Sequence, residues 1–245
     1  MWYWLFKYVF MGPLLTLLGR PKVEGLEYVP DSGAVILASN HLAVADSFYL
    51  PLVVKRRITF LAKSEYFTGT GLKGWFQRWF YTVAGQVPID RTDADSAQAA
   101  LETASRLLDE GKLLGMYPEG TRSPDGRLYK GKTGMARVAL RTGVKVIPVA
   151  MIGTDEVNPP GSKMWRFGRV TVRFGKPMDF SRFEGLEGNR FIERAVVDEV
   201  MYELMRLSGQ EYVDLYAADV KVALEGGTGG SDGTPPARMP TSAAG

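Results

Sequence analysis

The chain has 245 residues, of which 45% are hydrophobic and 23% charged, a composition typical of a globular protein with a sizeable buried core. It has no cysteine and one histidine, so disulfides, thiolate nucleophiles and metal sites rich in cysteine or histidine are excluded. The formal net charge of +3 favours an anionic substrate or membrane surface over a nucleic acid.

The first segment of the chain, residues 2–18, is apolar and aromatic. A membrane-spanning helix needs about 20 apolar residues, whereas this segment is shorter, carries Lys7 and is interrupted by Gly12 and Pro13. Trp and Tyr cluster at its beginning, and these side chains favour the headgroup layer of a bilayer. We therefore expect residues 1–20 to form a helix that lies in a membrane face. The alternative is a helix packed on the protein core.

Strands and helices alternate through the rest of the chain. Apolar or alternating runs predict strands at 34–39, 58–63, 85–90, 112–117, 144–151 and 168–180. Helical spacing of apolar residues predicts helices at 47–54, 71–85, 93–112, 132–143 and 189–209. This order predicts an α/β fold in which helices flank a mostly parallel central sheet.

No repeat or linker divides the central part of the chain, so residues 21–225 are expected to form one domain behind the N-terminal helix. The last residues, 226–245, are rich in Gly, Pro, Ser and Thr and have little to bury. They are expected to be a disordered tail.

The only histidine, His41, follows the strand predicted at 34–39, and Asp46 comes five positions later. Imidazole can take the proton of a hydroxyl that attacks a carbonyl, while a carboxylate on its other ring nitrogen fixes the tautomer. A spacing of five leaves two residues about 140° apart on a regular helix. The pair can therefore meet only if His41 lies at the strand end and Asp46 on the first turn of the next helix. The alternative is a surface histidine at a strand end.

A second polar segment, YPEGTRSPDGRLYKGKTG at 117–134, is rich in turn-forming residues and also follows a predicted strand. Arg122 carries a fixed planar cation that suits phosphate oxygens, and Glu119 can orient it or a substrate hydroxyl. Lys130 and Lys132 add positive charge. A solvated charged loop is the alternative.

Arg91 ends the segment GQVPIDR at 85–91 and is a second candidate phosphate cation. Its neighbour Asp90 offers the alternative of an ordinary surface ion pair, which contributes little free energy.

The segment GRLYKGKT at 126–133 matches the pattern of the phosphate-binding loop of nucleotide hydrolases. That loop must follow a strand directly, whereas here the predicted strand ends near Tyr117 and a turn-rich stretch intervenes. The strand predicted at 144–151 also offers no carboxylate for magnesium at its end. A nucleotide-binding protein is therefore the remote alternative.

Four segments between residue 39 and about residue 150 occur in a characteristic order: Asn40-His41 with Asp46, then VPIDR, YPEGTRS and VIPVA. Together they resemble the motif blocks of the glycerolipid acyltransferase family, which contains the 1-acyl-glycerol-3-phosphate acyltransferases. Tyr117 stands where many members have phenylalanine. Four ordered blocks are far more specific than any one of them.

The resemblance implies a role for each matching residue. His41 would be the general base that activates the acceptor hydroxyl, and Asp46 would orient it. Pro148 would help shape the side that receives the acyl donor. The residues that would bind the glycerol phosphate are Arg91, Glu119, Gly120, Thr121 and Arg122.

The implied reaction transfers a fatty acyl group from a thioester of coenzyme A or acyl carrier protein to the free hydroxyl of 1-acyl-glycerol 3-phosphate, giving phosphatidic acid for phospholipid biosynthesis. No metal or other cofactor and no nucleic acid is implied. Backbone N–H groups are expected to bind the developing oxyanion, and the aromatic helix at 71–85 is a candidate wall for the acyl chain.

The substrate also predicts where the protein works. Lysophosphatidic acid and its product reside in the bilayer, so we expect a peripheral or monotopic protein on the cytoplasmic face of the cell membrane, where acyl thioesters are made. The same chemistry on glycerol 3-phosphate, a lysophospholipid or a glycolipid is the main alternative.

Overall fold

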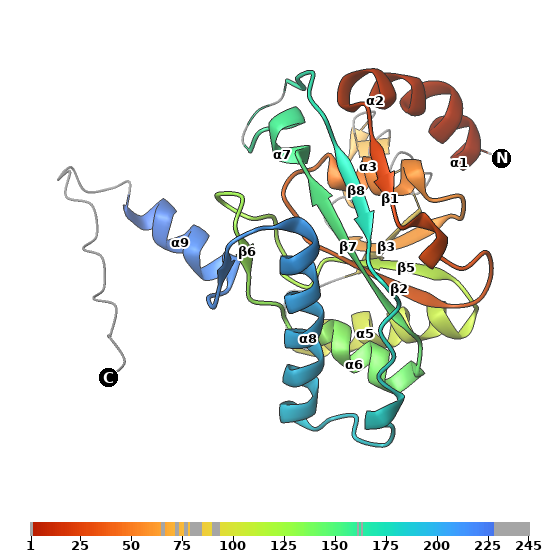
Figure 1. Ribbon diagram of the computed structural model, residues 1–245, viewed down its shortest axis with the longest axis vertical. Coiled ribbons are helices and arrows are strands. Elements are labelled where there is room, and N and C mark those ends of the chain that lie inside the picture. Colours follow the sequence, from red (N-terminus) through yellow and green to blue (C-terminus); the bar gives the residue numbers. More distant parts are fainter. Residues whose placement is uncertain are drawn as a thin grey trace.

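The computed structural model describes residues 2–64, 67–71, 74, 75, 78, 85–89, 94–160, 162 and 164–227. Seven strands of this part form one sheet with helices on both faces (Figure 1). Across the sheet the order is β1 (Lys22–Glu24), β8 (Thr171–Phe174), β7 (Val146–Ile152), β2 (Val35–Ser39), β5 (Leu113–Met116), β3 (Ile58–Lys63) and β4 (Gln86–Ile89). Neighbouring strands run parallel except β7 and β8. The predicted α/β fold with a mostly parallel sheet is therefore confirmed.

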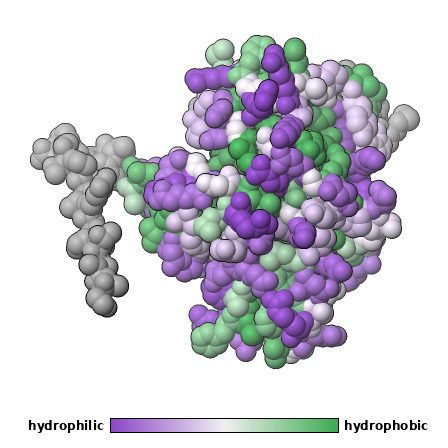
Figure 2. All heavy atoms as spheres, viewed as in Figure 1, coloured by the Kyte–Doolittle hydropathy of each residue, from purple (hydrophilic) through white to green (hydrophobic). Residues whose placement is uncertain are grey.

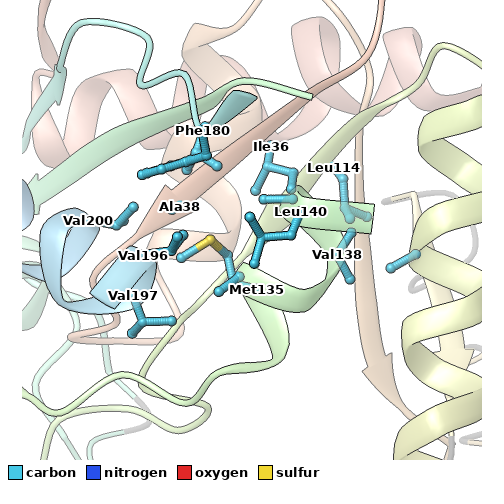
Figure 3. Packing of buried hydrophobic residues seen from close by; sticks show 14 of the residues in the cluster. Ile36, Ala38, Leu114, Met135, Val138, Leu140, Phe180, Val196, Val197 and Val200 are labelled. Carbon is cyan, nitrogen blue, oxygen red and sulfur yellow. The ribbon is translucent and has the colours of Figure 1, made fainter. Parts of the chain in front are cut away.

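The central strand β2 is buried along its whole length because both of its faces are covered. Ile36 and Ala38 point to one face, where they pack with apolar side chains of α5 (Ala94–Asp109), α6 (Gly134–Thr142) and α8 (Arg190–Ser208), as Figure 3 shows for part of this cluster. The alternate side chains of β2 point to the other face. They pack with α3 (Asp46–Val53) and with α2 (Gly12–Gly19).

The longest helix of the described part, α8, has a clear start and end in the sequence. Asn189 caps its first turn, where the side-chain oxygen accepts hydrogen bonds from the amides of Phe191 and Ile192. Gly209 ends the helix in the left-handed region, at a φ of 73°. These two signals explain why its boundaries are predictable from the sequence.

The helix predicted at 1–20 is present over residues 2–19, but it is not a regular α-helix. It consists of α1 (Trp2–Leu5), a π-helical turn η1 (Phe6–Met11) and α2. Pro13 lies in the first turn of α2 and cannot donate a backbone hydrogen bond to the preceding turn. The wider π turn accommodates this interruption, and a Cβ atom on Gly12 would lie only 2.4 Å from the Lys7 carbonyl oxygen.

None of the described helices is both long and apolar enough to cross a membrane.

Several short elements have no clear sequence signal. They are β1, the pair β6 (Leu128–Tyr129) and β9 (Tyr212–Val213), α7 (Thr154–Val157), α9 (Ala217–Gly227) and the 3₁₀ turns η2 (Leu26–Tyr28) and η4 (Ser181–Phe183). Most of the aromatic helix expected at 71–85 and most of the expected tail, residues 228–245, lie outside the described residues.

Candidate active site

The candidate site lies where β2 and β5 end. These two strands are parallel neighbours, so their carboxyl ends meet at one edge of the sheet. His41 follows the end of β2 at Ser39, and the 117–122 segment follows the end of β5 at Met116. In the sheet order, β3, β4 and β5 lie on one side of β2 and β7 and β8 on the other. An edge at which the chain changes sides is the usual ligand site of an open α/β sheet.

His41 and Asp46 meet as their spacing requires. His41 lies in the turn after β2, Asp46 is the first residue of α3, and the His41 Nδ1 atom lies 2.8 Å from Asp46 Oδ2. The Asp46 carboxylate accepts this hydrogen bond, so the proton lies on Nδ1 and the lone pair on Nε2. The side chain of His41 is 16% exposed. The pair thus presents a nitrogen base at the sheet edge.

Backbone amides of the turn that contains His41 hold the Asp46 carboxylate in place. Its side chain is fully buried, and Oδ2 also accepts the backbone N–H groups of Leu42 at 2.7 Å and Ala43 at 2.9 Å. Three donors on one oxygen stabilise the carboxylate and fix its position relative to the imidazole. Because these two amides are occupied, they are not free to bind an oxyanion. The expected backbone oxyanion donors therefore remain a prediction, and they must come from elsewhere.

Tyr117 covers one face of the imidazole. Its ring stacks on His41 with a centroid distance of 3.8 Å and an interplanar angle of 12°. Its hydroxyl lies 3.1 Å from the Ser47 hydroxyl, which fixes the ring against α3. Burial raises the pKa of the Tyr117 phenol, and the charge of Asp46 raises it further. The hydroxyl therefore stays protonated, and Tyr117 acts as a positioning residue for His41.

Glu119 joins the His41 turn to the loop after β5. Its side chain is buried, with Oε1 accepting the amide of His41 at 3.0 Å and Oε2 the amide of Tyr129 at 2.9 Å. Burial raises the pKa of this carboxyl to about 7, partly offset by the two backbone hydrogen bonds. The structure thus shows a positioning contact for Glu119. A direct contact with substrate remains a prediction.

The next three residues form a rim beside Glu119, in which Gly120 and Arg122 are exposed and Thr121 is half-buried. Gly120 adopts a φ of +74°, and its amide donates to the Tyr117 carbonyl at 3.0 Å, which closes a tight turn. The Thr121 hydroxyl accepts a hydrogen bond of 2.8 Å from Lys221 Nζ. Arg122 is exposed. The backbone of Ser123 donates to the His41 carbonyl at 2.7 Å, which ties this rim to the histidine turn.

The roles predicted for two further site residues, Arg91 and Pro148, stay predictions. Arg91 lies outside the described residues. Pro148 is buried within β7, where the strand register places it level with Ala38, three residues before His41. Its ring lies against Gly175, since a Cβ atom there would be 2.7 Å from Pro148 Cγ. A role in shaping the donor side therefore stays a prediction for Pro148.

The 126–133 segment does not have the structure of a nucleotide phosphate loop. It contains β6, whose two residues are buried and pair with β9. It also begins well after β5 ends at Met116. The required succession of strand, glycine-rich loop and helix is absent at this segment.

Sequence reasoning missed Gln210, which links three parts of the site. Its side-chain oxygen accepts from Asn40 Nδ2 at 2.7 Å, and its Nε2 donates to the Gly126 carbonyl at 2.7 Å. Asn40 in turn bonds both backbone groups of Met151 in β7. Gln210 follows α8, far along the chain from the motifs, so no local sequence pattern indicates it.

The comparisons with known proteins agree with this geometry. The family model described as Acyltransferase matches residues 20–152, which is more than half of the chain and includes His41, Asp46 and the 117–122 segment. The chain belongs to the acyltransferase family. The match ends at Ile152, the last residue of β7, so it contains β2, β5 and the loops that follow these two strands.

Curated members of the family are similar over most of this chain. A chloroplastic 1-acyl-sn-glycerol-3-phosphate acyltransferase of Arabidopsis thaliana is 35% identical over 167 residues, covering 67% of this chain and 45% of its own length. A 1-acyl-sn-glycerol-3-phosphate acyltransferase of Borreliella burgdorferi is 31% identical over 133 residues, covering 54% of this chain and 51% of its own. The chain thus spans about half the length of these relatives.

A solved acyltransferase structure has the same fold. The 1-acyl-sn-glycerophosphate acyltransferase PlsC of Thermotoga maritima aligns with a TM-score of 0.58 and 30% sequence identity. The alignment covers 79% of this chain and 76% of that chain. The similarity therefore extends well beyond the motif segments.

Proposed function

We propose that this acyltransferase transfers a fatty acyl group from an acyl thioester to the free hydroxyl of 1-acyl-glycerol 3-phosphate, forming phosphatidic acid. The observation that carries the proposal is the His41–Asp46 pair, buried at its carboxylate end and in contact at 2.8 Å. The names of the relatives support the choice of acceptor. The donor is a thioester of coenzyme A or acyl carrier protein.

The geometry accounts for the proton transfers. The acceptor hydroxyl gives its proton to His41 Nε2 while its oxygen attacks the thioester carbonyl carbon. The carbon–sulfur bond then breaks, and the thiolate takes the proton back from the imidazolium. Asp46 stabilises the imidazolium, and Tyr117 keeps the ring from turning. General base catalysis of this kind contributes about 10²–10⁴-fold to the rate.

The phosphate of the acceptor binds at the rim formed by Gly120, Thr121 and Arg122. Arg122 is exposed and forms no ion pair with any residue that the structure describes, so its guanidinium is available to a phosphate. The rim is tied to the His41 turn through Ser123 and Glu119. A phosphate held there would place the glycerol hydroxyl towards the imidazole.

We further propose that residues 2–19 bind the membrane in which the acceptor resides. Tyr8, Val9 and Leu17 each expose more than half of their surface. Lys7, the one charge within the apolar segment, points inward, where it donates to the Val54 carbonyl and lies near the rings of Trp4 and Tyr8. The outer side of this helix is therefore largely apolar and aromatic, and Figure 2 shows green spheres among pale purple ones where Figure 1 places α1 and α2.

Vesicle flotation tests the membrane proposal. The double variant Val9→Glu, Leu17→Glu should float less with anionic phospholipid vesicles than the wild type. Phe191→Glu is the matched control, because Phe191 is 87% exposed but lies at the start of α8. If both variants lost vesicle binding to the same extent, membrane binding could not be assigned to the N-terminal helix.

Thiol release tests the proposed reaction. Purified protein in detergent is mixed with palmitoyl-coenzyme A and either 1-acyl-glycerol 3-phosphate, glycerol 3-phosphate or no acceptor. We expect release that depends on 1-acyl-glycerol 3-phosphate and falls at least about 10²-fold in His41→Ala. Equal release by both proteins would refute the role of His41, and a preference for glycerol 3-phosphate would change the acceptor.

A further inference from the structure

Three cations gather around the rim of the site. Besides Arg122, the side chain of Lys132 runs over Gly120, so that a Cβ atom on this glycine would lie 3.2 Å from Lys132 Cδ and 3.6 Å from Nζ. Lys221 of α9 reaches the rim from the other end of the chain and donates to the Thr121 hydroxyl at 2.8 Å. None of the three forms an ion pair with a carboxylate of the described residues.

Neighbouring basic residues on the same loop behave differently. Arg127 pairs with Asp125 at 2.6 Å, and Lys130 pairs with Asp214 at 2.8 Å. The loop therefore has both neutralised and unneutralised cations. The cations without an ion pair are Arg122 itself, Lys132 beside Gly120 and Lys221 beside Thr121. Like charges held together without an ion-paired carboxylate favour the binding of an anion.

The pKa shifts of Lys221 and Glu119 agree with the closeness of Lys221 to the rim. Burial lowers the pKa of the Lys221 ammonium, and the positive charge of Arg122 lowers it further, while Glu119 and Glu225 act in the opposite direction. Lys221 in turn opposes the upward shift in the pKa of Glu119. Lys221 is thus close enough to act on both the exposed and the buried side of the rim.

We propose that Lys221, which lies on α9, binds the phosphate of the acceptor together with Arg122 and Thr121. The ligand is the phosphate monoester of the acceptor, so the inference rests on the proposed function. Lys221 lies outside the 20–152 family match. One of its three N–H donors is used by Thr121, and two remain for phosphate oxygens.

Other contacts hold α9 in place, so the hydrogen bond from Lys221 to Thr121 is not required to fix the position of this helix. Ala217 is fully buried, the Lys130 amide donates to the Leu215 carbonyl at 3.0 Å, and the Lys130 ammonium lies 5.9 Å from the centre of the Tyr216 ring. These contacts hold the start of α9 against the loop that contains β6. The ammonium of Lys221 is therefore available for binding.

Three variants separate charge from tethering. Lys221→Gln keeps a neutral N–H donor for Thr121 but removes the charge, and Lys221→Arg restores the charge. Lys112→Gln is the matched control, because Lys112 is an exposed lysine that precedes β5 at the opposite end of the sheet. Steady-state kinetics give KM for 1-acyl-glycerol 3-phosphate and for palmitoyl-coenzyme A. Calorimetry with the detergent-solubilised full chain gives Kd for 1-acyl-glycerol 3-phosphate and for 1-acyl-glycerol.

We expect Lys221→Gln to raise KM and Kd for 1-acyl-glycerol 3-phosphate roughly 10-fold or more, as loss of a hydrogen bond to a charged group implies. KM for the donor and Kd for 1-acyl-glycerol should not change, Lys221→Arg should recover most of the affinity, and Lys112→Gln should match the wild type.

A rise in the donor KM alone would assign Lys221 to the phosphates of coenzyme A and overturn the inference. Equal weakening for both lipids, or wild-type behaviour of Lys221→Gln, would show a tether or no role. If the wild type transfers no acyl group, the proposed function fails, and the two Kd values still decide whether Lys221 binds the phosphate.

Discussion

The two halves of the site differ in how completely the protein satisfies them. Around His41, the Nδ1 atom, the amides of residues 41–43 and both oxygens of Glu119 already have partners within the protein. The exception is the buried Asp46 Oδ1, which has no hydrogen-bond partner among the described residues. At the rim, Arg122, Lys132 and Lys221 have no carboxylate partner among the described residues.

This difference separates positioning from binding. The histidine half is organised before substrate arrives, as proton transfer requires, because a fixed base and a fixed carboxylate need no reorganisation during the reaction. On the proposed function, the phosphate of the acceptor supplies the negative charge that the cationic half lacks. Changes in the first half should therefore affect the chemical step, and changes in the second should affect acceptor affinity.

The largest expected effect is on the Asp46 carboxylate. Asp46→Asn can keep an oxygen towards the amides of Leu42 and Ala43, but it removes the charge that stabilises the imidazolium. We expect kcat to fall by about 10²–10⁴, while circular dichroism stays that of a folded protein. An unchanged kcat would show that the orientation of His41 needs no charge.

Glu119→Gln should damage the link between the two halves. A glutamine offers one oxygen to two backbone N–H donors, so either the His41 or the Tyr129 amide faces an NH₂ group. We expect a loss of about 1–3 kcal/mol in the free energy of unfolding, measured by urea denaturation. Glu102→Gln on the exposed surface of α5 is the control. A loss no larger than in this control would contradict the buried bridge.

The raised pKa of Glu119 also predicts a pH dependence. Between the unfolded value near 4.5 and the folded value of about 7, the native state binds more protons than the unfolded state at this group. Its contribution to stability therefore falls as pH rises through this window and is constant above it. The stability difference between wild type and Glu119→Gln should shrink from pH 5 to pH 7.5. A stability difference that grows over this pH range would show that folding lowers the pKa of Glu119 instead of raising it.

The smallest expected effect concerns the Tyr117 hydroxyl. Tyr117→Phe removes the hydrogen bond with Ser47 but keeps the ring that stacks on His41. We expect a loss of about 0.5–1.5 kcal/mol in unfolding free energy and little change in kcat. Tyr117→Leu, which removes the aromatic ring, should lower kcat further. Equal kcat values in the two variants would remove the role assigned to stacking.

The sequence predicts those features that depend on local patterns. The apolar runs locate β2, β3, β5 and β7, and the spacing of His41 and Asp46 defines the one strand–turn–helix geometry in which they meet. The two-residue strands β6 and β9 are too short to have a period, and they pair across more than 80 positions. Short strands of this kind depend on tertiary contacts.

Long-range contacts also explain which site residues sequence reasoning missed. Gln210 and Lys221 contact the motif segments only because the chain after α8 passes beside them. The number of backbone donors around Glu119 likewise depends on where β6 lies. The motif shows that a carboxylate is present at position 119, but only the fold shows that both of its oxygens are occupied.

The most direct test is to compare kcat and acceptor KM for Asp46→Asn and Arg122→Gln in one assay with palmitoyl-coenzyme A. The division between the two halves predicts that Asp46→Asn lowers kcat with little change in KM for 1-acyl-glycerol 3-phosphate. It predicts that Arg122→Gln raises this KM with a smaller change in kcat. If both variants change the same parameter to the same extent, the histidine half and the cationic rim do not have separate roles.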